Sequence, residues 1–154
     1  MKQESITIRN IESAFAGESM AHIKYRYFAK IARAAGDLDT ARVFEETAAQ
    51  EVEHAFGHLD LLFPPSELTP AKALELAIAG ETYEYSEMYP NFRHLAEQEG
   101  NVAAVQEMDE QIAESKEHAE RFRQTLATAA KRFAALAKVE KRHADQYKVA
   151  LAKV

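Results

Sequence analysis

The chain has 154 residues, a formal net charge of −6 at pH 7 and no cysteine. The acidic balance argues against the basic surface that a nucleic-acid-binding protein needs. The lack of cysteine excludes disulfides, thiolate metal sites and thiol catalysis. No run approaches the ~20 apolar residues of a membrane span, and the N-terminus lacks the apolar core of a signal peptide. We therefore expect one cytoplasmic domain, residues 1–154, that binds neither nucleic acid nor a membrane.

Few glycines and prolines interrupt the chain, and its apolar residues recur at helical spacing, which predicts an all-α fold. Clear breaks are expected at Gly36, at Pro64-Pro65 and at Gly100, and a weaker one near residues 125–128. The expected helices cover about residues 5–35, 39–63, 70–99, 102–126 and 128–152.

Carboxylates interrupt the apolar face of four expected helices, at positions where leucine would normally stand. In chain order these groups are Glu18; Glu51 with His54; Glu81 with Glu84; and Glu140 with His143. Residues three apart share a helix face, so each pair points the same way. Burying an acid is costly unless a positive group meets it. The apolar face of the third helix holds no lysine or arginine, so a metal ion is the first candidate.

The chemistry of these side chains narrows the choice of metal. Oxygen-rich ligands with one or two imidazoles suit iron or manganese better than structural zinc. Five inward glutamates carry more negative charge than one divalent ion can offset, whereas two di- or trivalent ions match it. The sequence therefore predicts a two-metal carboxylate site inside a helix bundle.

An internal repeat relates the two halves of the chain. Residues 15–18, Phe-Ala-Gly-Glu, are echoed by residues 78–81, Ile-Ala-Gly-Glu. A tyrosine follows each glutamate after seven or eight positions, at Tyr25 and Tyr89. Two copies of a helical hairpin that meet face to face predict a pseudo-twofold bundle.

The repeat leaves the ligands of the last helix open. The offset that maps Glu18 onto Glu81 also maps Glu51 onto Glu114, but the helical phase puts Ser115 on the inward side. Glu140 with His143 is therefore preferred. The alternative is Glu114 with either Glu117 or His118.

Four runs of sequence resemble the rubrerythrins, which are di-iron proteins of the ferritin-like superfamily. The runs are AFAGES at residues 14–19, EVEHA at 51–55, GETYE at 80–84 followed by MYP at 88–90, and AKVEKRH at 137–143. The resemblance covers nearly the whole chain except about residues 102–131. It implies a ferritin-like four-helix bundle with an additional connecting helix.

The resemblance also implies roles for individual residues. Two iron ions, or manganese in their place, would be held by Glu18, Glu51, His54, Glu81, Glu84, Glu140 and His143. Glu51 and Glu140 would bridge the metals, and one iron would exchange Glu84 for His54 as its oxidation state changes. Tyr25 and Tyr89 would be the catalytic residues beside the metals, hydrogen-bonded to ligand carboxylates.

Rubrerythrins commonly carry a C-terminal rubredoxin-like domain whose iron is held by four cysteines, and this chain has none. We therefore expect electrons to come from a separate donor protein, either rubredoxin-like or a flavoprotein.

The link between the second and third helices is short for a ferritin-like bundle, in which these two helices run parallel. The stretch from Glu51 to the end of the second helix and the stretch from the start of the third helix to Glu81 together rise ~35 Å. The link must travel back over this distance, whereas residues 64–70 span at most ~25 Å. We expect a helix-swapped homodimer with two sites, in which the extra helix at about 102–126 brings the chain back.

The expected function is reduction of hydrogen peroxide to water at the di-iron centre. An alternative within the same superfamily is a ferroxidase, an oxygen-reducing enzyme or an iron-storage subunit. A third hypothesis, from another class, is a metal-free helical module that binds other proteins.

Overall fold

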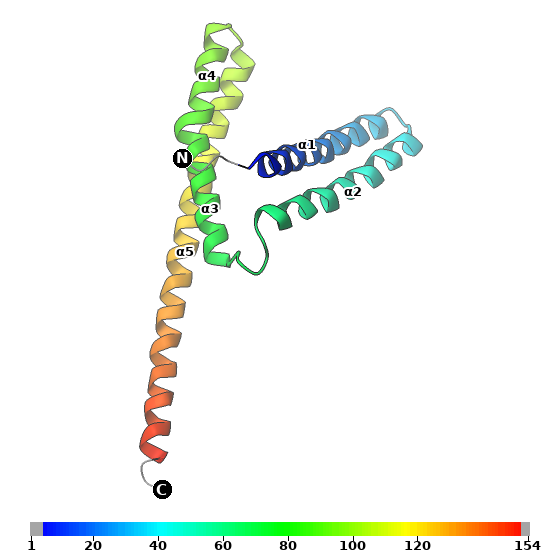
Figure 1. Cartoon of the computed structure of the whole chain (residues 1–154). Helices are drawn as coiled ribbons and strands as arrows, with labels where there is room; N and C mark the ends of the chain where they lie inside the picture. Colours follow the sequence, from blue (N-terminus) through cyan, green and yellow to red (C-terminus); the bar gives the residue numbers. More distant parts are fainter. Residues whose placement is uncertain (1–4, 152–154) are drawn as a thin grey trace. The chain divides into compact units, whose positions relative to one another are not determined.

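The structure is a computed structural model that describes residues 5–151, except the side chains of residues 147, 149 and 150. These residues form helices and no strand, which confirms the all-α prediction (Figure 1). The elements are α1 (Ile6–Ala34), α2 (Leu38–Leu62), α3 (Pro70–Tyr83), the π-helical turn η1 (Glu84–Met88), α4 (Tyr89–Gln98) and α5 (Val102–Leu151). Over this range, no helix has an apolar stretch long enough to cross a bilayer.

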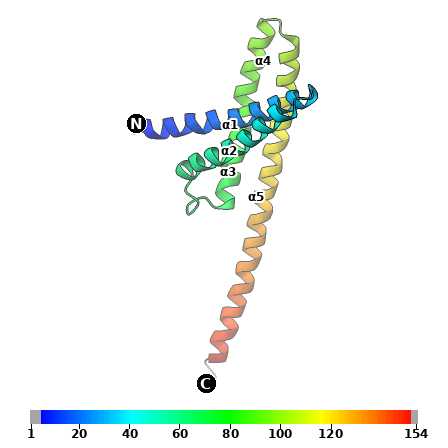
Figure 2. The same cartoon turned by 90° about the vertical axis from the view of Figure 1, so that its right-hand side faces the viewer.

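The chain groups into two compact units, and its organisation as one domain stays a prediction. The first unit, Met1–Leu68, is a hairpin of α1 and α2. In the second unit, Thr69–Val154, the rod formed by α3, η1 and α4 packs along α5. Figures 1 and 2 both show this rod beside the N-terminal half of α5. Each unit is therefore a pair of antiparallel helical rods.

The turn of the first unit follows from two residues. Gly36 has φ +80°, a left-handed conformation that glycine adopts without a Cβ clash. Asp37 then caps α2, because its side chain accepts a hydrogen bond from the backbone N–H of Thr40 at 3.0 Å. That bond lowers the pKa of the Asp37 carboxyl.

Small side chains let the two helices of the first unit approach closely. Ala41, Ala48 and Ala55 are buried at seven-residue intervals along α2, and Ala29 of α1 is buried as well. An alanine stripe of this kind allows close helix packing but contributes little apolar area per residue.

The sequence predicts one uninterrupted α-helix for the first rod of the second unit. The structure instead has the π turn η1 in the middle of that rod. The backbone N–H of Tyr89 reaches back five residues to the carbonyl of Glu84. Pro90, the next residue, has no N–H and would collide with the carbonyl four residues before it in a regular helix. A wider π turn just before the proline avoids that collision.

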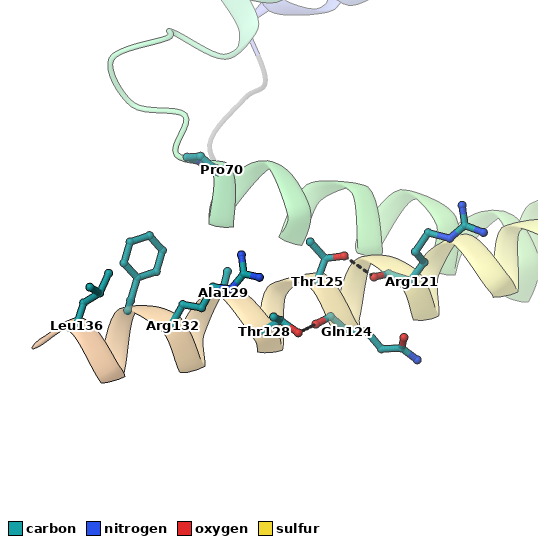
Figure 3. Close-up of a pocket in the computed structure, with 9 residues that line it drawn as sticks. Pro70, Arg121, Gln124, Thr125, Thr128, Ala129, Arg132 and Leu136 are labelled. Atoms are coloured by element: carbon teal, nitrogen blue, oxygen red, sulfur yellow. Dashed lines mark hydrogen bonds between the residues drawn. The ribbon is translucent and has the colours of Figure 1, made fainter. Parts of the chain in front are cut away.

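The break predicted at residues 125–128 is wrong, since α5 is continuous from Val102 to Leu151. This stretch contains no glycine or proline and is rich in alanine, the strongest helix former. The hydroxyls of Thr125 and Thr128 donate hydrogen bonds to the carbonyls of Arg121 and Gln124, so both hydroxyls are satisfied within the helix (Figure 3). In the same view α3 begins at Pro70, beside this part of α5.

Candidate metal centre

The first unit brings three predicted ligands together. Glu18 comes from α1, and Glu51 and His54 come from successive turns of α2. One ligand atom from each lies within 4.8 Å of the other two. Nδ1 of His54 is 2.9 Å from Oε2 of Glu51. The two carboxylates are half-buried and the imidazole is exposed.

This group is chemically suited to a metal ion. Two half-buried carboxylates at this separation repel each other, and a cation between them would remove the repulsion. Carboxylate oxygens with an imidazole nitrogen form a donor set typical of iron and manganese sites. The residues of the first unit therefore fit the predicted metal.

An apolar cavity of about 330 Å³ lies between α1 and α2. Its lining is Phe15, Ser19, His22, Ile23, Val52, Ala55, Phe56 and Leu59, which includes the sequence neighbours of Glu18 and Glu51. His22 is held in place because its Nδ1 donates a hydrogen bond to the carbonyl of Ala48 at 2.7 Å. Apolar walls of this kind lower the local dielectric and strengthen electrostatic interactions at the carboxylates.

In the second unit, Glu81 and Glu84 face α5. The hydroxyl of Ser115 donates a hydrogen bond to Oε2 of Glu84 at 3.0 Å. Nδ1 of His118, one turn further along α5, is 3.5 Å from Oε1 of Glu81. The other oxygen of Glu81, Oε2, is buried and has no hydrogen-bond partner among the described residues. A buried carboxylate oxygen without a partner is costly, so this site also favours a bound cation.

The structure does not bring Glu140 and His143 together with Glu81 and Glu84. Both lie exposed on the C-terminal part of α5. The helix rises ~37 Å between Ser115, which contacts Glu84, and Glu140. Their role as metal ligands stays a prediction.

The alternative ligands lie closer to the rod of the second unit. Glu114 and Glu117 are exposed, whereas Ser115 is buried and His118 contacts Glu81. The helical phase of α5 correctly predicts Ser115 on the inward side. The sequence analysis, which prefers His143, does not predict the contact between His118 and Glu81.

The two predicted catalytic tyrosines both pack against aromatic rings. Tyr25 lies 5.9 Å from Phe44 between ring centroids, and Tyr89 lies 6.5 Å from Phe92. Burial raises the pKa of Tyr89, and the charges of nearby glutamates, Glu84 foremost, raise it further. The hydrogen bonds predicted from these tyrosines to ligand carboxylates stay predictions.

Known proteins resemble the chain over most of its length. The Rubrerythrin family profile matches residues 9–63 and 58–126. A nigerythrin from Nitratidesulfovibrio vulgaris is 38% identical over 128 residues, which cover 75% of this chain and 63% of that protein. A rubrerythrin from the same organism is 41% identical over 107 residues, covering 62% and 56%. The chain thus spans less than two thirds of the length of these two relatives.

Two further comparisons also cover most of the chain. A rubrerythrin from Porphyromonas gingivalis is 39% identical over 137 residues, which cover 80% of this chain and 67% of that protein. A solved structure of nigerythrin in its fully reduced, all-ferrous state is 34% identical, with a TM-score of 0.42. That alignment covers 84% of this chain and 70% of the nigerythrin chain.

Proposed function

The chain belongs to the rubrerythrin family, and from that premise we propose that it is a di-iron redox enzyme that reduces hydrogen peroxide to water. The observation that carries the proposal is the group of Glu18, Glu51 and His54, whose ligand atoms lie within 4.8 Å of one another. The profile matches residues on both sides of this group and also the segment that holds Glu81 and Glu84.

The proposed ligands on the first three rods are Glu18, Glu51, His54, Glu81 and Glu84. From the last helix, the sequence favours Glu140 with His143, and the contact to Glu81 favours His118. When bound, two ferrous ions would act as Lewis acids and supply one electron each to the peroxide. The donor set fits manganese as well as iron.

The protein supplies apolar side chains and hydroxyl groups near those ligands. The open pocket between α1 and α2 is lined mainly by apolar side chains. The Tyr89 hydroxyl is protonated near neutral pH, as in any tyrosine, and burial raises its pKa further, so the hydroxyl can donate a hydrogen bond. Tyr25 is proposed to do the same from the first unit.

Three partners complete the proposal: hydrogen peroxide as substrate, a separate rubredoxin-like protein or flavoprotein as electron donor, and a second copy of this chain. The cytoplasm is the proposed location. The helix-swapped homodimer rests on the length of the link between α2 and α3, residues 63–69, which spans at most ~25 Å. Light scattering at micromolar concentration should give a dimer. A metal-loaded monomer would contradict the helix exchange.

Metal analysis combined with stopped-flow oxidation tests the function. We expect two iron ions per chain after anaerobic loading, and oxidation of the reduced protein by peroxide orders of magnitude faster than by dioxygen. Faster oxidation by dioxygen would instead identify an oxidase. A large shell in sedimentation would identify a storage subunit. A protein that binds no iron would be a helical interaction module.

A further inference from the structure

The two units are copies of one hairpin, and their turns fix how the copies align. Gly36 and Gly100 both have positive φ, and the residue after each caps the next helix through its side chain. These capping residues, Asp37 and Asn101, are 64 positions apart, as are the two glycines. The turns of the two units are therefore equivalent at this offset.

The first helices of the two units align at a different offset. Glu18 and Glu81 are 63 positions apart, and so are the residues that follow them. Those residues make the same bond in both units: Ser19 donates to the carbonyl of Phe15, and Thr82 to the carbonyl of Ile78. One extra residue must therefore lie between Glu81 and Gly100.

The π turn η1 accounts for that extra residue, because a π bulge is the insertion of one residue into an α-helix. The second helices consequently align at the offset of the turns rather than that of the first helices. At this offset Glu51 corresponds to Ser115, not to Glu114, and His54 corresponds to His118. Burial agrees with the assignment, since the next equivalent pair, Ala55 and Ala119, is buried in both units.

The aligned units contain the same ligand types in different places. The first unit has one carboxylate on each helix, Glu18 and Glu51, with the imidazole of His54. In the second unit, serine replaces the second-helix carboxylate, and Glu84 stands where the first unit has Ala21. Each unit thus offers two carboxylates and one imidazole. Four carboxylates in all match the charge of two divalent ions.

We propose that Ser115 is a positioning residue, which holds Glu84 as a metal ligand of the second unit beside the imidazole of His118. This inference rests on the proposed di-iron function. The Ser115 hydroxyl bonds to Oε2 of Glu84 and leaves Oε1 free for a metal. His118 already lies within reach of Glu81 on the adjacent turn. Hydrogen bonds of this kind to ligands typically contribute 10- to 100-fold in metal affinity.

Titration of the full metal-free chain with Co²⁺ under anaerobic conditions tests the imidazole. Visible absorption and calorimetry would report the number of ions bound and their affinities. We expect two ions per wild-type chain and only one tightly bound ion in His118→Ala. His143→Ala, which removes the alternative imidazole of α5, should retain both ions, and loss of an ion in this variant would overturn the assignment. Two ions in His118→Ala at wild-type affinity would overturn the assignment. A wild-type chain that binds no Co²⁺ would instead contradict the proposed function.

The positioning role has a separate test in the same titration. Ser115→Ala should weaken the second Co²⁺ ion by about tenfold and change its absorption bands, and Ser115→Thr, which keeps the hydroxyl, should restore them. Thr128→Ala is the control, because the Thr128 hydroxyl bonds only to its own helix backbone. Unchanged affinity and absorption in Ser115→Ala would show that the serine merely packs, whatever happens to metal-free stability.

Discussion

The two units show how one helical hairpin can present the same ligand types in two arrangements. In the first unit, carboxylates from both helices converge within 4.8 Å, together with an imidazole. In the second unit, both carboxylates come from the first rod, and α5 meets them with the Ser115 hydroxyl and the His118 ring. The first unit thus brings three ligand side chains together. In the second unit, the Ser115 hydroxyl stands at the position that corresponds to Glu51.

The difference between the units has two causes in the sequence. The π turn shifts everything after it by one position, so the residue that corresponds to Glu51 is Ser115. Glu84, at the start of that turn, supplies the second carboxylate of this unit from the first rod. The two units therefore offer the same number of carboxylates and imidazoles, with the second carboxylate on a different helix.

The largest expected effect comes from breaking the three-ligand group. Glu51→Gln keeps the shape of the side chain and removes its charge, so we expect affinity for the first Co²⁺ or Fe²⁺ ion to fall by about 100-fold or more. Glu53→Gln is a matched control, because Glu53 is exposed and lies outside the group. Calorimetry measures both variants. Equal affinities in the two would show that the first unit holds no metal through Glu51.

Much of the first unit could be predicted from its sequence. Gly36 and Pro64 delimit α2, and the spacing of Glu51 and His54 places both on the face that meets Glu18. These are local signals, since turn residues and helical period depend only on neighbours in the chain.

The second unit was harder to predict, because its key features depend on register. A π turn has no strong sequence signature apart from Pro90, and missing it misaligns the repeat by one residue. The threonines at 125 and 128 suggested a break, but their hydroxyls bond within the helix. The preference for Glu140 with His143 follows from the helical phase, which turns Ser115 rather than Glu114 inward, and from the run AKVEKRH at residues 137–143. The contact of His118 with Glu81 could be found only by packing α5 against the rod.

The next largest effect is expected from removing the extra residue of the second unit. Deleting Glu87, an exposed residue of η1, should convert the π turn to an α turn and place Pro90 inside a regular helix. The cost should be about 3 kcal/mol or more of unfolding free energy, measured by urea denaturation. The residues beyond it should keep their orientation, because the bulge holds the one extra residue, so the buried Ala96 and the 2.6 Å bond from Arg93 to Asp109 should be retained.

A double variant isolates the contribution of the proline. Deletion of Glu87 with Pro90→Ala removes both the extra residue and the proline clash, so we expect most of the lost stability to return. Pro90→Ala alone is the control and should cost little. A double variant as unstable as the deletion alone would show that the residues beyond η1 lost their register, and would contradict η1 as the one extra residue of the second unit.

The smallest expected effect compares the two turns, which the alignment of the hairpins makes equivalent. Gly36 and Gly100 have φ of +80° and +72°, and a Cβ added at either would meet nothing within 4 Å. Replacement by alanine should therefore cost only the backbone strain, about 1 kcal/mol of unfolding free energy in each unit. Gly57→Ala is the control of opposite sign. Gly57 lies inside a helix with free space around it, so its replacement by alanine should raise the free energy of unfolding. Clearly unequal costs at Gly36 and Gly100 in urea denaturation would argue against the equivalence, and with it against the pairing of Glu51 with Ser115.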